Sequence, residues 1–208
     1  AALPEATARA AACALAIQEA MATLSRGADV RPTLRIGVAA GPLEVLYVGG
    51  SGRWECVPTG GPLRGMALAL EAAAVGEVVL AEEAWARIAD RARGSVRGGG
   101  CVRLDNIDIL PAAPRPAPIP GEGRALSAFV SPAIRDRLAA GQTDWLSELR
   151  RVTVLFIHFA GLDGALPDRL ARTQAAFSSA LQSLDLFEAS VDKLAVDDKG
   201  MVLLAALG

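Results

Sequence analysis

The sequence lacks a long apolar run and an excess of either charge. Its longest uncharged apolar stretch covers residues 152–162, far short of the roughly 20 residues that span a bilayer as a helix. Nineteen Arg and two Lys are set against 23 Asp and Glu in 208 residues, which leaves a formal net charge of −2 without long runs of one sign. These absences argue against a membrane protein and against a strongly basic nucleic-acid binder.

Cysteine and histidine are also scarce. The three cysteines, Cys13, Cys56 and Cys101, lie more than forty residues apart and form no zinc or redox motif. The single histidine, His158, falls inside an expected strand, so no Ser/His/Asp or Cys/His catalytic arrangement is predicted. The Ala-rich start lacks the charged leader and apolar block of a signal peptide. We therefore expect a cytoplasmic protein.

Two blocks of mixed helix and strand patterns are present, and a proline-rich segment separates them. Residues 111–123 read PAAPRPAPIPGEG, which is typical of a semi-rigid connector. We predict one partial domain over residues 1–110, a linker and connector over 111–149, and a second partial domain over 150–208. The alternation of elements predicts an α/β fold, a sandwich of helices on sheets.

The first block predicts a helix, a hairpin and further strands and helices. The apolar stripe of the first helix is expected at Ala10, Ala14, Ile17, Met21 and Leu24, with Gly27 as its C-terminal cap. A strand is expected over 34–38 and a hairpin over 43–57, around a Gly-Gly-Ser-Gly turn that lacks the Lys-Ser/Thr of a phosphate-binding loop. A second helix is expected to begin near Pro62 and to bury Leu63, Met66 and Leu70. The remaining expected elements are a strand over 77–81, a helix from Glu82 towards Arg93, and one or two strands over 95–110 around a turn at the glycine triplet 98–100.

The second block predicts a strand, a helix and two more strands. Residues 151–159 are nearly all apolar and often β-branched, which is typical of a central strand covered on both faces. Pro167 is expected to start a helix whose Leu170, Phe177, Leu181 and Leu184 share one side. Residues 189–196 and 201–207 then predict a hairpin around Asp-Asp-Lys-Gly. Short helices are expected at 134–138 and 145–149.

Taken together, these segments resemble class III nucleotidyl cyclase domains. LRIGVAAG at 34–41, the following hairpin, RWECVPTG at 53–60 and the Ala-rich helix are similar to the C-terminal half of one such domain. RVTVLFIHFAG at 151–161 and VDKLAVDDKGMVLLAALG at 191–208 are similar to the N-terminal half of a second. The bridge SPAIRDRLAAGQTDWLSELRRVTVLF resembles the join between the tandem domains of soluble, bicarbonate-responsive adenylyl cyclases, whose bacterial relatives often carry an AAA-type ATPase.

The resemblance implies a ferredoxin-like fold and a specific reaction. Two such domains pair head to tail, within a chain or as a dimer, with nucleotide sites between them. The ribose 3′-hydroxyl of ATP attacks the α-phosphate and releases pyrophosphate, while two Mg²⁺ or Mn²⁺ ions, held by two carboxylates, neutralise charge. An Asn and an Arg steady the transition state. The metal carboxylates and the Asn/Arg pair of the productive site are expected to lie outside these 208 residues, so the chain itself is expected to be inactive.

Three residues of the second block match positions of the family's site. Lys193 lies where the family has its purine-reading Lys, although a solvated strand Lys is the alternative. Asp197 lies at the position of the second metal carboxylate, although Asp is also common in hairpin turns. His158 stands where the first metal Asp is expected, and a neutral imidazole is a poor ligand for Mg²⁺. The second domain is therefore expected to be degenerate as a metal site.

The first block also departs from the family pattern. Arg64 and Leu68 occupy the positions of the catalytic Asn and Arg. Arg64 is a candidate for an anion at the pseudo-site, near the start of a helix, or is a surface Arg. The Arg that bicarbonate-responsive relatives carry on this helix falls at Ala67, which puts bicarbonate activation in doubt.

Three hypotheses remain open from the sequence. In the leading hypothesis, the chain is part of a tandem cyclase that makes cyclic AMP in intracellular signalling. The choice between ATP and GTP as its substrate is undecided. The second is a non-catalytic sensor module that regulates a downstream ATPase. The third is a single circularly permuted domain, in which the strand at 151–159 would pair with the strand at 34–38.

Overall fold

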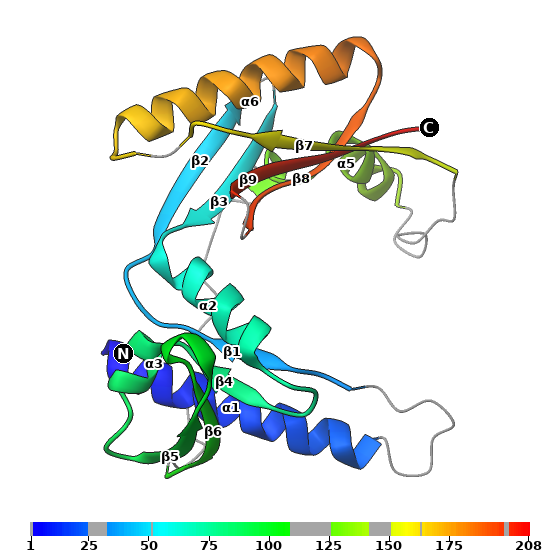
Figure 1. The fold of residues 1–208 in the computed structure, drawn as a ribbon. Coiled ribbons are helices and arrows are strands. Elements are labelled where there is room, and N and C mark those ends of the chain that lie inside the picture. Colours follow the sequence, from blue (N-terminus) through cyan, green and yellow to red (C-terminus); the bar gives the residue numbers. More distant parts are fainter. Residues whose placement is uncertain are drawn as a thin grey trace. The chain divides into compact units, whose positions relative to one another are not determined.

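The computed structural model describes residues 2–24, 33–50, 52–108, 126–141, 151–162, 164–197 and 200–208 (Figure 1). The chain forms two compact units. Unit one combines residues 1–43 with 60–116, and unit two combines residues 44–59 with 117–208. Both units contain helices and strands, so the expected α/β class is confirmed. The proline-rich segment at 111–123 and the helix expected at 145–149 lie outside the described residues.

Unit one contains a four-stranded sheet in the order β1-β4-β6-β5. The strands are β1 (Ile36–Val38), β4 (Val78–Leu80), β5 (Ala92–Val96) and β6 (Val102–Ile107). Parallel pairing joins β1 to β4, whereas β6 is antiparallel to both of its neighbours. The short 3-10 turn η1 (Gly98–Gly100) connects β5 to β6, as the glycine triplet predicted.

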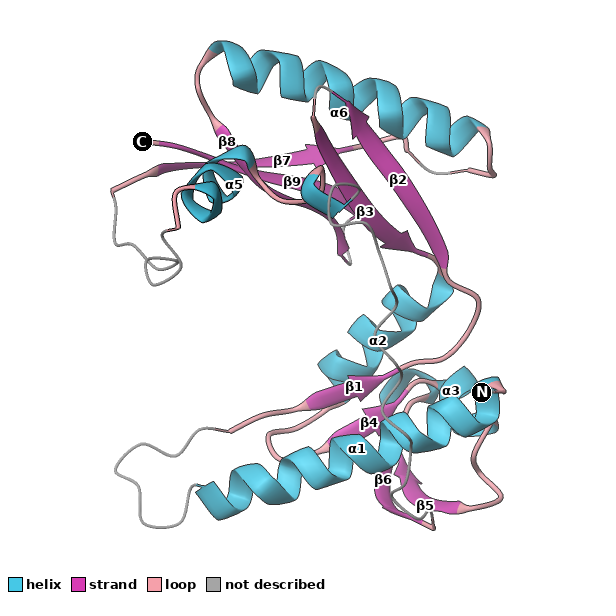
Figure 2. Cartoon of the chain, turned by 180° about the vertical axis from the view of Figure 1, so that it is seen from behind, coloured by secondary structure: helices cyan, strands magenta, loops and turns pink. Residues whose placement is uncertain are grey.

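Helices cover both faces of this sheet (Figure 2). Because side chains alternate along a strand, Val78 and Leu80 of β4 face α1 (Leu3–Leu24), while Val79 and Ala81 pack with α2 (Gly61–Ala72). All three residues of β4 are buried for this reason. A short helix, α3 (Glu82–Ala86), follows β4 directly.

The buried stripe of α1 differs from the expected one. Its buried residues are Thr7, Ala8, Ala11 and Ala14, whereas Ile17 is 45% exposed and Leu24 69% exposed. A helix of 22 residues is about 33 Å long, and strands of three to six residues are only about 10 to 20 Å long. The short sheet therefore covers mainly the N-terminal half of α1, where alanines allow close approach.

Small residues also form the buried side of α2. Met66 and Leu70, which were expected to be buried, are 45% and 37% exposed, while Ala69 and Ala73 are buried. The cause is the close approach of β1, because a Cβ added to Gly37 would lie 2.6 Å from the carbonyl oxygen of Met66. At this separation Gly37 has no room for a side chain of its own.

Unit two is built around a split β-α-β arrangement. Its sheet has the order β7-β9-β8, from β7 (Thr153–Phe159), β8 (Ser190–Asp197) and β9 (Gly200–Leu207). Both outer strands are antiparallel to β9 and hence parallel to each other. The helix α6 (Asp168–Leu186) connects them. It buries Phe177, Leu181 and Leu184, as its periodicity predicted, whereas Leu170 of the same predicted side is 36% exposed.

The hairpin of β2 (Glu44–Gly50) and β3 (Arg53–Thr59) packs in unit two, although its sequence belongs to the first block. Leu46, Val48 and Val57 join one core with residues of α6 and β9. Residues 126–141 also join this unit, since the N–H of Trp54 donates a 2.8 Å hydrogen bond to the carbonyl oxygen of Ala128. They include α5 (Pro132–Ala139), which confirms the helix expected at 134–138.

The expectation of a covered central strand at 151–159 is wrong. Among the described strands β7 lies at the edge of its sheet, with Val154 57% and Phe156 66% exposed. The central place belongs to β9, whose Val202, Leu203 and Ala205 are buried. The single permuted sheet is also contradicted within the described strands, because β7 pairs with β9 while β1 pairs with β4.

Candidate functional site

The sheet of unit two has an inner face under α6 and an outer face on the opposite side. Register and strand alternation place six of the larger described side chains on the outer face, together with the small side chains of Ser190, Ala195 and Ala206. The six larger ones are Val154, Phe156 and His158 of β7, Val202 and Leu204 of β9, and Lys193 of β8. A small β-bulge at Asp192 brings Lys193 to this face, opposite Leu204. The outer face is thus an apolar surface with one basic side chain and one imidazole at its margins.

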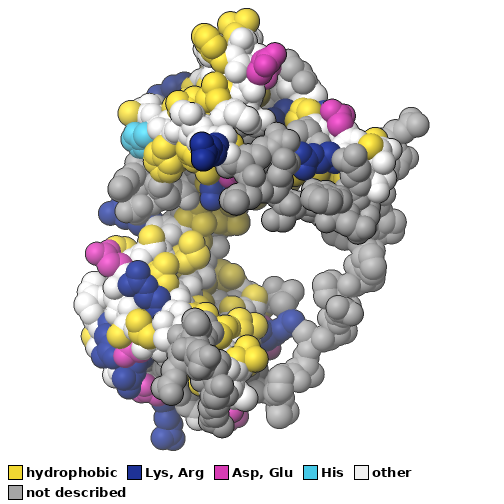
Figure 3. Space-filling model, turned by 90° about the vertical axis from the view of Figure 1, so that its right-hand side faces the viewer, with side chains coloured by type: hydrophobic (Ala, Val, Ile, Leu, Met, Phe, Trp, Pro, Cys, Tyr) yellow, Lys and Arg dark blue, Asp and Glu magenta, His cyan; other side chains and the backbone are white. Residues whose placement is uncertain are grey.

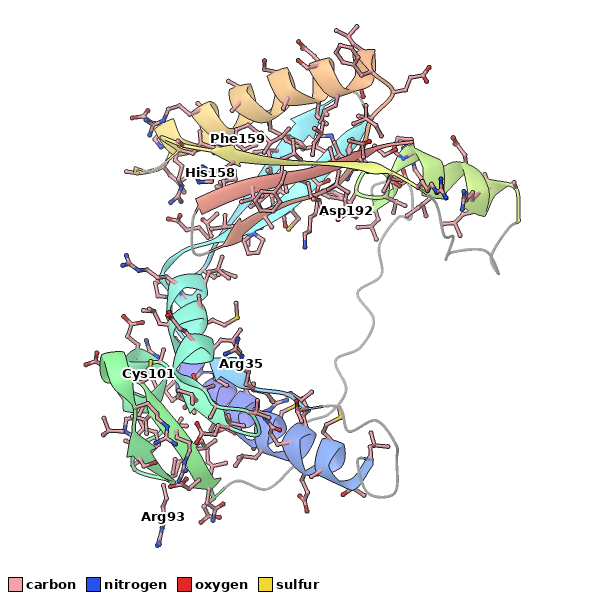
Figure 4. All side chains as sticks on the ribbon, turned by 45° about the vertical axis from the view of Figure 1, so that its right-hand side comes forward. Arg35, Arg93, Cys101, His158, Phe159 and Asp192 are labelled. Carbon is pink, nitrogen blue, oxygen red and sulfur yellow. The ribbon has the colours of Figure 1, made fainter. Side chains whose placement is uncertain are left out.

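His158 lies near the end of β7, beside the beginning of β9. It pairs with Val202 in register, and a Cβ added to Gly200 would lie 3.2 Å from its Nε2 atom. Its side chain is exposed, and the cyan histidine is visible at the surface in Figure 3 beside hydrophobic side chains. Figure 4 labels it together with Phe159 of the same strand and Asp192 of β8. His158 shares its face with the exposed side chains of Val154 and Phe156.

Lys193 and Asp197 are separated from His158 by the central strand. Ala195 is level with His158 across β9, and Lys193 lies two residues further along β8. Strand spacing then gives roughly 12 Å between the Cα atoms of His158 and Lys193. The backbone of Asp197 pairs with Gly200 at the hairpin end, and its side chain is outside the described part. The positions of His158, Lys193 and Asp197 therefore lie at three separate points on the margin of the apolar outer face.

Arg64 lines a pocket of about 250 Å³ within unit one. The pocket lies between the first turn of α2, the start of α3 and the η1 turn, and Glu82, Glu83 and Cys101 also line it. Burial, and next the charge of Glu82, raise the pKa of the Cys101 thiol. The carboxylates of Glu82 and Glu83 beside Arg64 oppose the binding of an anion in this pocket. The thiol of Cys101 stays protonated, so it is neither a ready nucleophile nor a ready metal ligand.

A second pocket, of about 360 Å³, lies within unit two and was missed by the sequence reasoning. Its polar lining includes Arg53, Asp136, Asp185 and Glu188. The guanidinium of Arg53 already has partners within the protein. Its Nη2 atom forms an ion pair with the Glu55 carboxylate at 2.6 Å and donates a hydrogen bond to the carbonyl oxygen of Asp192 at 3.3 Å. The lining comes from three separate segments, and no spacing motif in the sequence connects them.

The described residues do not fit a magnesium site. No group of three His, Cys, Asp or Glu side chains in the described ranges is arranged to hold a metal ion. His158 stands at the position where the resemblance expects an Asp, and hard Mg²⁺ ions prefer oxygen ligands. No metal-dependent step is therefore assigned to these residues.

No protein-family model matches this chain, and no curated protein matches its sequence. Among the helices that the structure describes, none combines the length and the apolar character needed to cross a membrane.

Proposed function

We propose that the chain is part of a cytoplasmic class III nucleotidyl cyclase with tandem cyclase domains, which converts ATP into 3′,5′-cyclic AMP and pyrophosphate. In this proposal the 208 residues contribute one side of a nucleotide site and do not catalyse by themselves. Lys193 binds the purine at the outer face of unit two. Pairing of cyclase domains, within a longer chain or between chains, supplies the rest of the site.

The topology of unit two carries this proposal. The order β7-β9-β8, with α6 as the crossover, agrees with the first three strands of the ferredoxin-like sheet that the resemblance implies. This topology places Lys193 and His158 on one sheet face that α6 does not cover. An ammonium group donates hydrogen bonds to ring-nitrogen or carbonyl acceptors of a purine, and the neighbouring Phe156 and Leu204 offer apolar surface to its flat faces.

Calorimetric titration of the chain with ATP tests the role of Lys193. A hydrogen bond from a charged donor contributes about 1.5 to 3 kcal/mol, so Lys193→Gln is expected to raise the Kd for ATP about 10- to 100-fold. Lys199→Gln, which removes the only other lysine, is the matched control and is expected to leave the Kd nearly unchanged. Equal effects of the two changes would show that the overall charge matters, and absence of ATP binding would overturn the proposed purine site.

A second assay tests whether the chain is inactive alone. Incubation with ATP and either Mg²⁺ or Mn²⁺ is expected to yield no cyclic AMP, because no described donor set fits the two metal ions. Formation of cyclic AMP by the purified chain would contradict this part of the proposal. Titration with GTP in parallel determines which purine the site prefers.

The second candidate is a non-catalytic cyclase-homology module that senses a nucleotide and regulates a downstream ATPase. The exposed imidazole of His158, in place of the expected carboxylate, favours this candidate. The two candidates differ in a longer form of the protein that includes complete domains. A cyclase forms cyclic AMP there, whereas a sensor binds ATP without turnover and changes the rate of ATP hydrolysis by the attached ATPase.

A further inference from the structure

The outer face of the β2–β3 hairpin carries exposed aromatic side chains. Alternation along the two strands places Tyr47 and Trp54 on the face opposite to the buried Val48 and Val57. Tyr47 is 57% exposed and Trp54 is 38% exposed. Phe129, which is 40% exposed, lies edge-on to Tyr47, with ring centroids 6.0 Å apart. We call Tyr47, Trp54 and Phe129 the aromatic patch.

The aromatic patch gathers a scarce class of residue at the surface of unit two. Aromatic residues make up 4% of the chain, and the patch contains its single tyrosine together with one tryptophan and one phenylalanine. Val45 and Pro58 are exposed on the same face of the hairpin and extend the apolar surface. Aromatic side chains contribute large apolar areas when they are covered, and a surface where several of them gather is typical of a binding site.

The position of the chain beside the aromatic patch indicates which segment covers it. Leu126 is the first described residue after the proline-rich segment at 111–123. Two residues later, the carbonyl oxygen of Ala128 accepts a 2.8 Å hydrogen bond from the N–H of Trp54, and Phe129 belongs to the patch itself. The proline-rich segment is therefore tethered a few residues from the patch. A short tether gives an effective concentration in the millimolar range, which favours this segment over a free partner.

We propose that residues 117–120 (APIP) dock on the aromatic patch of unit two in the polyproline II conformation. All four side chains are apolar and uncharged, and Ile119 adds a large side chain to the two prolines. Proline restricts the free segment, so little conformational entropy is lost on docking, and such segments bind aromatic-lined surfaces. Pro120 lies six residues before Leu126, a span of up to about 20 Å, and the two glycines between them let the chain turn back.

Proline chemistry disfavours a simpler alternative, in which the same segment extends the sheet at the outer edge of β3. Pro118 and Pro120 have no N–H group to donate, and Pro58 of β3 lacks one as well. The segment must then be held through its side chains, which is how proline-rich segments bind aromatic surfaces. The proposal concerns the face of the hairpin and does not depend on nucleotide binding at Lys193.

Fluorine NMR of the whole chain labelled with 5-fluorotryptophan tests this docking. The chain has three tryptophans, and the signal lost in Trp54→Phe assigns the Trp54 resonance. The difference in its chemical shift between H2O and D2O reports the exposure of the ring to solvent. The double variant Pro118→Ser/Pro120→Ser is expected to raise this difference, because release of the segment uncovers the indole. The matched control Pro111→Ser/Pro114→Ser removes two prolines outside the docking residues and is expected to leave the difference unchanged.

A peptide titration gives an independent measure. A synthetic peptide of residues 111–123 is expected to bind the Pro118→Ser/Pro120→Ser chain at least about tenfold more tightly than the wild-type chain, whose own segment covers the patch. Adding Tyr47→Ser to the double variant is expected to weaken peptide binding at least about tenfold. Phe187→Ser, at a residue that is 72% exposed after α6, is the control and is expected to leave binding unchanged. Circular dichroism verifies that each variant folds.

Four results would each overturn the proposal. An equal solvent isotope shift of Trp54 in the wild-type chain and in the double variant would show that the prolines do not cover the ring. An equal rise in the proline control would show no preference for residues 117–120. A Trp54 shift that depends on protein concentration would assign the face to a second copy of the chain. Equally tight peptide binding by the wild-type chain would assign the face to a free proline-rich partner.

Discussion

The side-chain amide of Gln174 on α6 hydrogen-bonds both backbone groups of Gly49 on β2, 125 residues earlier in the chain. Its Oε1 atom accepts from the Gly49 N–H at 3.0 Å, and its Nε2 atom donates to the Gly49 carbonyl oxygen at 2.6 Å. One side chain thus satisfies a donor and an acceptor at the tip of the hairpin. This contact ties the β2–β3 hairpin to unit two.

Replacing Gln174 is expected to destabilise unit two. Gln174→Ala leaves both half-buried backbone groups of Gly49 without their partners, which costs about 1 to 3 kcal/mol of unfolding free energy. Urea denaturation followed by circular dichroism measures the loss. The control is Gln182→Ala, an exposed position on the same helix, with an expected change within about 0.5 kcal/mol. Equal stability of the two variants would contradict the role of this amide.

Gly49 is expected to tolerate no side chain. Its φ of 155° is rare for L-residues, and an added Cβ would lie 2.2 Å from the carbonyl oxygen of Arg53. Gly49→Ala should therefore lower the unfolding free energy by at least about 1 to 3 kcal/mol. Gly50→Ala is the neighbouring control, because no atom lies within 4 Å of a Cβ added there. Denaturation curves of both variants test the prediction, which is wrong if Gly49→Ala is as stable as Gly50→Ala.

The core of unit two depends on Phe177. This side chain is 1% exposed and packs with residues of the hairpin and of β9. Phe177→Ala is expected to cost about 3 to 5 kcal/mol, from lost apolar burial and the cavity left behind. Phe187→Ala, at a 72% exposed position, is the control and is expected to change stability by less than about 0.5 kcal/mol. Thermal and urea unfolding of both variants give the comparison.

Glu77 is expected to make the unfolding free energy of unit one depend on pH in the acidic range. Hydrogen bonding from Arg97, aided by the Ala74 N–H and by Arg103, lowers the pKa of Glu77 from 4.5 to about 2. Because the folded pKa is the lower one, the stabilisation is complete above about pH 4.5 and is lost as the pH falls towards 2. Glu77→Gln should therefore be less stable than wild type at pH 7, with a difference that shrinks across this window.

The same experiment in an Arg97→Ala background identifies the partner. Because Arg97 is the largest cause of the lowered pKa, the pH-dependent loss of stability caused by Glu77→Gln should become smaller in that background. Urea midpoints measured at several pH values between 7 and 3 supply the data. An undiminished loss in the Arg97→Ala background would assign the effect to another group.

Local structure followed the sequence closely in several places. Pro62 lies in the first turn of α2, the glycine triplet forms the η1 turn, and the helix after Pro167 buries three of the four residues of its predicted apolar side. Each of these signals acts within a few residues, through a fixed proline φ, a positive φ at glycine or a repeat of 3.6 residues. The position of Lys193 on β8 was also predictable, since the alternating pattern and the turn after it are local.

Burial at α1, α2 and β7 did not follow the sequence in the same way. Apolar periodicity predicts which residues share a face, but the neighbour of that face determines whether they are covered. The close approach of β1 leaves Met66 and Leu70 of α2 partly exposed, and the edge position of β7 exposes Phe156. The acidic lining of the pocket beside Arg53 was equally invisible, because distant segments supply it.

By itself, the sequence determined the α/β class, the order of most elements and the turns between them, because these depend on chain-local dihedral preferences and periodicity. Only the tertiary structure decided that the hairpin at 44–59 joins unit two and that β9, rather than β7, is central in its sheet. Those outcomes depend on long-range contacts such as that of Gln174 with Gly49. The free energy of such contacts is shared by residues more than a hundred positions apart, so no local pattern encodes it.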